Sequence, residues 1–168
     1  VVFMGQGSKF DSALGTLGGR SNFITASDIS SGDSLAKEIL SEMKKEEIKF
    51  TKNKIIFAAK LENGNKIFLE KGGLDHIIKA HGADFEKSFG VKNNKILELL
   101  SDTISKGKLI SSKYHESNGI VGYRSKYYYQ GQYMIVYGIA ENGYIETAYP
   151  RKYHGGNKWW KKLLFELA

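Results

Sequence analysis

Four β-rich segments follow one another between residues 108 and 149, and short polar joints separate them. The segments cover residues 108–114, 120–129, 132–139 and 144–149. The joints contain Ser117-Asn118-Gly119, Gln130-Gly131 and Glu141-Asn142-Gly143, which are typical residues of hairpin turns. Joints this short connect antiparallel neighbours, because a parallel connection needs a long crossover. The stretch therefore predicts an antiparallel meander.

Helical patterns precede the meander. Residues 33–45 and 93–106 carry apolar side chains at the helical spacing. Between them, the β-rich runs 54–60 and 66–70 are joined through Asn63-Gly64, which favours a hairpin. Helices followed by an antiparallel sheet indicate the α+β class. We expect N-terminal helices packed on one face of a twisted antiparallel sheet of four or more strands.

The first part of the chain has a different composition. Residues 1–32 are rich in Gly, Ser, Asn and Asp, which predicts loops and short pieces of structure. We expect residues 1–65 to form a linker-like or entry-like segment with one helix and the first strand. Residues 66–168 would then form the main domain. No apolar run in the sequence is long enough to span a bilayer.

Residues 72–82 predict a short helix that ends at Gly82. This helix carries His76 and His81, two of the four histidines in the chain. A regular helix would hold these side chains about 140° apart. They converge only if the helix ends near Ala80, which leaves His81 on a final turn. His81 also lies on the apolar stripe, so the alternative is a core His81 and a surface His76.

Charge and cysteine content limit the functions and sites that this chain can have. The chain has 25 lysines and arginines against 18 acidic residues, a net charge of +7, and 12% aromatic residues. A basic chain with many aromatic residues suits nucleic-acid binding, although a basic surface also keeps a protein soluble. The chain has no cysteine, which excludes a disulfide framework, a thiolate zinc site and a cysteine nucleophile.

Two histidines can cleave an RNA phosphodiester without a cofactor. One imidazole takes the proton from the 2′-hydroxyl, and the other gives a proton to the leaving 5′-oxygen. The phosphorane needs a cation or hydroxyl donors that face it. His115 and His154 lie near the ends of predicted strands and are secondary candidates for these roles.

The predicted strands offer groups that could face a phosphate. Alternation points Thr147 and Tyr149 to one face of the last strand and Glu146 to the other. Arg124 and Lys126 share a face of the second strand, and a guanidinium suits bidentate phosphate binding. The alternatives are ordinary β-propensity for the hydroxyl residues and a solvated face for the two cations.

The C-terminal tail combines basic and aromatic residues, among them Lys158 and Trp159. Basic groups for phosphates and flat rings for unstacked bases are typical of single-stranded RNA binding. The alternative is a closing segment whose aromatic side chains pack on the core.

Three motifs occur in the order Leu74-Asp75-His76-Ile77-Ile78 with His81, Tyr123-Arg124 and Thr147-Ala148-Tyr149-Pro150. Together they resemble the barnase–EndoU–colicin–RelE (BECR) group of ribonucleases, and most closely bacterial EndoU-type toxin domains. The resemblance covers about residues 66–150 and implies that residues 66–168 are a nuclease domain. Such domains are C-terminal toxins of contact-dependent growth-inhibition and polymorphic toxin systems.

The resemblance implies a metal-independent endoribonuclease toxin that cleaves tRNA and leaves a 2′,3′-cyclic phosphate, with no cofactor. It assigns catalysis to His76, His81, Arg124, Thr147 and Tyr149. It also implies delivery from outside into the target-cell cytoplasm and an acidic cognate immunity protein as a partner.

Substrate binding is expected from Lys126, Lys92, Lys158 and Trp159, and the first two are also alternatives to Arg124 as the catalytic cation. Two other functions stay open from the residues alone. One is a non-catalytic nucleic-acid-binding module with structural histidines. The other is a structural domain of a phage or surface protein whose charge is incidental.

Overall fold

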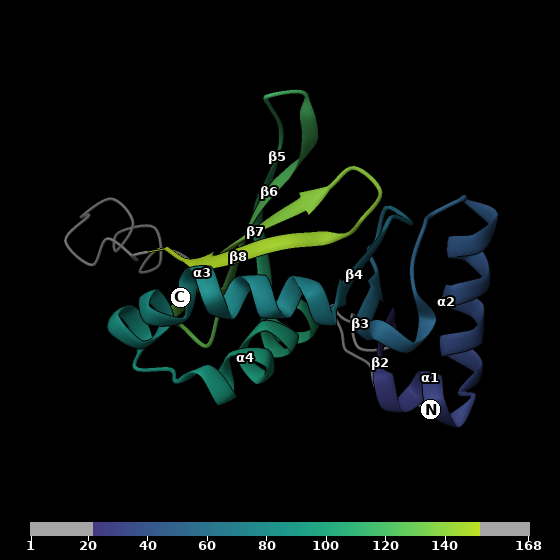
Figure 1. The fold of residues 1–168 in the computed structure, drawn as a ribbon, viewed down its shortest axis with the longest axis horizontal. Coiled ribbons are helices and arrows are strands. Elements are labelled where there is room, and N and C mark those ends of the chain that lie inside the picture. Colours follow the sequence, from purple (N-terminus) through teal and green to yellow (C-terminus); the bar gives the residue numbers. More distant parts are fainter. Residues whose placement is uncertain (1–21, 152–168) are drawn as a thin grey trace.

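The computed structural model describes residues 22–151 of the 168-residue chain and has an α+β fold (Figure 1). Its elements in chain order are β2 (Phe23–Thr25), α1 (Ala26–Ser31), α2 (Ser34–Lys45), the 3-10 helix η2 (Lys52–Lys54), β3 (Ile55–Lys60), β4 (Lys66–Glu70), α3 (Lys71–Phe89), α4 (Asn93–Lys106), β5 (Lys108–Ser117), β6 (Ile120–Tyr129), β7 (Tyr133–Ala140) and β8 (Ile145–Pro150). The strands form two antiparallel sheets, ordered β2-β3-β4 and β5-β6-β7-β8. The predicted fold class, helices packed on an antiparallel sheet of four strands, is confirmed.

The three-stranded sheet is buried on both faces. Phe57 and Leu69 lie on the face that joins the main core with α3, α4 and the larger sheet. Ala58 and Phe68, on the opposite face, pack with the apolar side of α2. Strands β2 and β3 and helix α2 therefore contribute side chains to the packed core. The predicted boundary after residue 65 falls in the turn of the β3–β4 hairpin.

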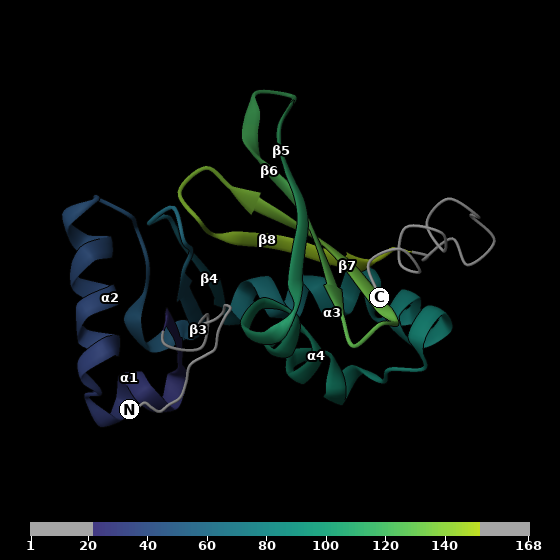
Figure 2. The same cartoon turned by 180° about the vertical axis from the view of Figure 1, so that it is seen from behind.

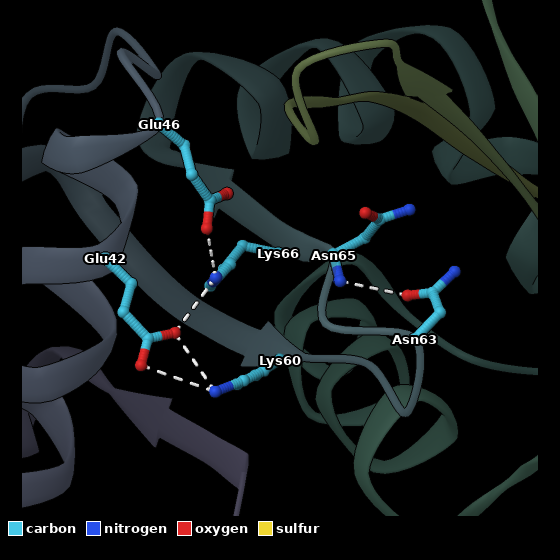
Figure 3. Close-up of polar contacts among 6 residues, drawn as sticks. All are labelled: Glu42, Glu46, Lys60, Asn63, Asn65 and Lys66. Carbon is cyan, nitrogen blue, oxygen red and sulfur yellow. Dashed lines mark hydrogen bonds and ion pairs between the residues drawn. The ribbon is translucent and has the colours of Figure 1, made fainter.

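A buried lysine joins α2 to this sheet (Figure 3). The Nζ atom of Lys66, a residue that is 5% exposed, lies 2.9 Å from Oε1 of Glu42 and 2.5 Å from Oε2 of Glu46. Burial lowers the pKa of Lys66, but the hydrogen bonds to Glu46 and Glu42 outweigh burial, so this pKa lies above its usual 10.5. Hydrogen bonds from Lys66 and Lys60 lower the pKa of Glu42. These contacts hold α2 across the β3–β4 hairpin.

Helices α3 and α4 lie together against one face of the four-stranded sheet (Figures 1 and 2). Tyr137 of β7 belongs to the same core cluster as Ile77 of α3 and Ile96 of α4. Its hydroxyl is fully buried, donates to the carbonyl oxygen of Leu100 at 3.0 Å and shares a hydrogen bond with Thr103. Among residues 22–151, no helix covers the other face of this sheet, and the tip of the β5–β6 hairpin extends beyond the helices in both views.

Helix α3 is longer than the sequence predicts. The predicted end at Gly82 is wrong, because α3 continues to Phe89. Gly82 is buried against the start of α4, where Oδ1 of Asn93 lies 2.5 Å from the position that a Cβ would take. This glycine therefore allows the two helices to approach. The helix stop is Gly90, whose φ of 69° is in the left-handed region.

Two short elements form in the segment before α2. The composition predicts loops and short pieces of structure for residues 22–32, and these residues contain the strand β2 and the helix α1. The Thr25 hydroxyl accepts a hydrogen bond from the backbone N–H of Asp28 at 3.3 Å, and the Asp28 carboxylate accepts one from the backbone N–H of Thr25 at 2.9 Å. This capping box starts α1, and Ile24 of β2 is fully buried. Among residues 22–151, no helix has the length and apolar character needed to cross a membrane.

Candidate active site

The face of the four-stranded sheet opposite the helices carries a row of residues from all four strands. Lys113 pairs with Arg124, Arg124 with Gly138, and Gly138 with Thr147. Directly paired residues of antiparallel strands share a face, so these four lie in line across the sheet. The row places Arg124 and Thr147, both predicted site residues, on either side of a residue that has no side chain.

A pocket of about 280 Å³ lies over this row. The lining residues with polar side chains are His115, Asn118, Tyr123, Arg124, Glu146, Thr147 and Tyr149. Gly138 also lines it, and a Cβ there would lie 2.9 Å from Cγ2 of Thr147. The hollow therefore depends on a glycine at this position. Its volume is close to the lower limit of roughly 300 Å³ for small-molecule sites, which suits a phosphate-sized group.

Arg124 and His115 form a contact inside this pocket. Nη2 of Arg124 lies 3.4 Å from Nε2 of His115. A guanidinium can only donate, so Nε2 of His115 is the acceptor and Nδ1 carries the ring proton in this contact. His115 pairs directly with Gly122, which leaves its side chain room to reach diagonally toward Arg124. His115, a secondary candidate in the sequence, thus lies with the predicted residues.

Thr147 supplies an unsatisfied polar group. Its hydroxyl oxygen is buried and has no hydrogen-bond partner among the described residues 22–151. Leaving a buried hydroxyl unpaired costs about 1–3 kcal/mol, and unsatisfied groups of this kind call for a functional explanation. A ligand oxygen in the pocket would supply the missing partner.

Glu146 reaches the pocket through an irregularity in β8. Gly138 pairs with Thr147 while its neighbour Ile139 pairs with Ile145, so Glu146 is an extra residue in the strand. A bulge of this kind re-aims the side chains beside it. The prediction that Glu146 faces away from Thr147 is therefore wrong, because both residues line the same pocket. No pattern in the sequence marks this bulge.

His81 lies beside the pocket rather than in its lining. Its ring centroid is 5.5 Å from that of Tyr149, which does line the pocket. Its Nδ1 lies 3.0 Å from Oδ2 of Asp84. Because a carboxylate can only accept, this contact fixes the ring with the Nδ1 proton toward Asp84 and leaves Nε2 available. The His81 side chain is 27% exposed, so it is not a core histidine.

His76 does not join this group. The expected convergence of His76 and His81 required a helix end near Ala80, and that end is wrong because α3 is continuous. The two side chains therefore leave the helix about 140° apart. His76 is exposed on the outer side of α3. Near Thr147 and Tyr149, the second imidazole is that of His115.

The predicted substrate-binding residues lie at different distances from the pocket. Lys126 lies one row from Arg124 on the same face, since it pairs with Val136, which in turn pairs with Tyr149. It is half-buried and does not line the pocket. Lys92 is exposed at the start of α4 and is also outside the pocket lining. The remaining predicted or secondary residues, Lys158, Trp159 and His154, lie outside the described residues.

Comparison with known protein families and with curated proteins finds no match to this chain. Within residues 22–151, no three histidine, aspartate or glutamate side chains gather in a way that could hold a metal ion. The fold and the pocket define an α+β domain with a small polar pocket on the sheet face opposite α3 and α4, where the Arg124 guanidinium and the Glu146 carboxylate both line the hollow. Its guanidinium, imidazole and hydroxyl groups can together hold an anionic group.

Proposed function

We propose that this chain is an endoribonuclease that cleaves RNA without a metal ion and holds the scissile phosphate in the pocket on the sheet. The observation that carries the proposal is the unpaired, buried hydroxyl of Thr147 in the same pocket as the Arg124 guanidinium. A phosphate has acceptor oxygens for both groups. RNA also brings its own nucleophile, the 2′-hydroxyl, so the protein needs to supply proton transfer and charge stabilisation only.

In the proposed reaction, Nε2 of His115 takes the proton from the 2′-hydroxyl. The 2′-oxygen then forms a bond to phosphorus, and the bond from phosphorus to the 5′-oxygen breaks. His81, which starts this step as the imidazolium, gives its Nε2 proton to that leaving oxygen and keeps its Nδ1 proton toward Asp84, so the products are a 2′,3′-cyclic phosphate and a 5′-hydroxyl. A phosphate that draws the Arg124 guanidinium to itself releases Nε2 of His115 for its role as the base.

Three groups stabilise the phosphorane in this proposal. Arg124 neutralises the added negative charge, and the hydroxyls of Thr147 and Tyr149 donate to its oxygens. The contact with Asp84 orients the His81 ring, and His81 reaches the leaving oxygen past Tyr149.

The biological setting stays a prediction that rests on the resemblance to BECR toxin domains. It comprises a toxin role, tRNA as the substrate, delivery into the cytoplasm of a target cell and a cognate immunity protein. The net charge of +7 suits both an RNA substrate and an acidic immunity protein.

The proposal is tested by incubating the full chain with total tRNA in the presence of EDTA. We expect cleavage products that end in a 2′,3′-cyclic phosphate. Arg124→Gln should lower the rate by about 100-fold or more, because it removes the cation that faces the phosphorane. The matched control is Lys44→Gln, which removes a charge from an exposed residue of α2 outside the proposed RNA-binding surfaces and should have a small effect.

Two outcomes would contradict the proposal. Cleavage that requires an added divalent metal ion would show that the mechanism is wrong. Binding of tRNA without cleavage would favour the alternative of a nucleic-acid-binding module.

A further inference from the structure

The β5–β6 hairpin carries an unusual share of exposed apolar surface. Among residues 22–151, the exposed large hydrophobic side chains are those of Leu109, Ile110, Tyr114, Ile120 and Tyr123. All of them belong to β5 or β6. A concentration of apolar side chains on one projecting element is typical of an interaction site.

The two faces of this hairpin differ in chemistry. Lys113 and Arg124 form a direct cross-strand pair on the face that holds the pocket, and Lys126 follows on the same face of β6. Tyr114 and Tyr123 form the next pair, so they lie on the opposite face. By strand alternation, one side of the hairpin therefore carries the cations and leads to the pocket, and the other carries the two tyrosines, of which Tyr123 is also among the residues that line the pocket.

The side of the hairpin with Tyr114 and Tyr123 begins where the hydrophobic core ends. Toward the base of the hairpin, the hydroxyls of Ser112 and Ser125 are 2.9 Å apart, and Ser125 is buried. Beyond this pair, the rings of Tyr114 and Tyr123 meet edge to face, with centroids 5.7 Å apart and an interplanar angle of 76°. Tyr114 is 56% exposed, so the contact leaves much of its surface open to a ligand.

We propose that this hairpin is a second RNA-binding site, in which Lys113 and Lys126 bind phosphates next to the pocket and Tyr114 stacks on an unpaired base. The inference rests on the proposed function for the identity of the ligand. Cations that follow a backbone, together with rings that stack on splayed bases, are the features by which proteins bind single-stranded RNA.

The opposite placement of the two surfaces restricts the ligand to RNA with unpaired nucleotides. β5 is the edge strand of the sheet, so a flexible strand can pass round it with phosphates on one face and a base on the other. The bases of a continuous duplex are stacked and paired inside the helix, so they cannot reach Tyr114. The site would therefore favour a loop or a single-stranded end.

The test measures binding separately from cleavage. The probe is a short fluorescein-labelled 2′-O-methyl RNA oligonucleotide, which has no free 2′-hydroxyl to act as the nucleophile, used alone and annealed to its complement. We expect Tyr114→Ser to weaken binding of the single strand by about tenfold in fluorescence anisotropy, because one stacking contact is lost. Tyr114→Phe should bind like the wild type because it keeps the ring. Leu109→Ser, an exposed apolar residue of the same strand, is the matched control and should also leave binding unchanged.

Salt and strandedness supply the other readouts. Lys113→Gln should reduce the slope of log affinity against log salt concentration by about one. The duplex should bind more weakly and should be insensitive to Tyr114→Ser. The inference is overturned if Tyr114→Ser binds the single strand like the wild type, or if it weakens duplex binding equally.

Failure of this inference can be distinguished from failure of the proposed function. If unmodified tRNA is cleaved but Tyr114→Ser does not change oligonucleotide binding, the hairpin site alone is overturned. The hairpin would then be free for a protein partner. Binding that depends on Tyr114, with no cleavage of any RNA, would support the hairpin site and overturn the ribonuclease.

Discussion

Replacing Thr147 by valine should separate stability from activity. The two side chains have nearly the same shape, and both suit a β-strand. The change removes a buried hydroxyl that has no hydrogen-bond partner among residues 22–151. We therefore expect Thr147→Val to stabilise the free protein, although it removes a group that we assign to catalysis.

The magnitude follows from the cost of an unpaired buried hydroxyl, which is about 1–3 kcal/mol. Taking the lower end, Thr147→Val should raise the free energy of unfolding by about 1 kcal/mol. For a chain of this length, this change corresponds to a rise of about 2–4 °C in the melting temperature. RNA cleavage should fall at the same time, because the valine cannot donate to the phosphorane.

Thr103→Val is the matched control. The Thr103 hydroxyl is also buried, but it has partners, because it shares a hydrogen bond with Tyr137, as donor or as acceptor, and lies 3.0 Å from the carbonyl oxygen of Leu100. Losing these bonds should lower the free energy of unfolding by about 1–2 kcal/mol. Urea unfolding followed by circular dichroism gives both values. If Thr147→Val destabilised the protein as much as Thr103→Val, the Thr147 hydroxyl would already have a partner and our reasoning about the pocket would be refuted.

Two further predictions concern the framework that holds the site. Gly73→Ala should lower the melting temperature, because its Cβ would lie 2.8 Å from the backbone oxygen of Ile145 and would push α3 away from β8. Gly72→Ala should instead raise the melting temperature slightly. The nearest atom to its added Cβ, the Tyr144 hydroxyl oxygen, would be 3.8 Å away, and alanine favours a helix by up to about 1 kcal/mol. The same change in melting temperature for both variants would contradict this packing. The Glu42 contacts should make stability depend on pH. Because Lys66 and Lys60 lower the pKa of Glu42 in the folded chain, its contribution is present above pH 4.5 and is lost as the pH falls below that value. As the pH is lowered through this range, the urea midpoint of Glu42→Gln should fall less steeply than that of the wild type. The same dependence on pH in both proteins would argue against the contacts.

The strands of the larger sheet could be predicted well because their turns have clear local chemistry. Asn118 and Gly119 have φ values of 53° and 77°, and Gln130 and Gly131 have values of 55° and 72°. Two successive positive φ values are the geometry of a tight hairpin turn, which sets the register of both strands. This register brings Arg124 opposite Gly138. It also places His115 diagonal to Arg124. The turn sequence alone could therefore have predicted that His115 is the second histidine of the site.

The features that escaped prediction depend on tertiary contacts. Glycine often ends a helix, but Gly82 instead leaves space for the side chain of Asn93 in α4. The bulge at Glu146 has no local signature, since it arises from how β8 pairs with β7. The pairing of His81 with Tyr149 required both the continuous helix and its packing along β8. Single-sequence patterns describe local geometry, and these features come from the meeting of separate elements.

The start of α1 is a different case, because a local signal was present. Thr25 and Asp28 have the spacing of a capping box. The surrounding glycine, serine and asparagine residues favoured loops and concealed this short helix.

The central claim is that the chemistry takes place in the pocket on the sheet and not on the outer side of α3. The most direct measurement compares the rate of tRNA cleavage in EDTA for His115→Ala and His76→Ala, both of which remove an exposed imidazole. We predict that His115→Ala lowers the rate by about 100-fold or more, as expected for loss of a general base. His76→Ala should cleave at a rate close to that of the wild type. Full activity in His115→Ala together with loss of activity in His76→Ala would contradict the claim.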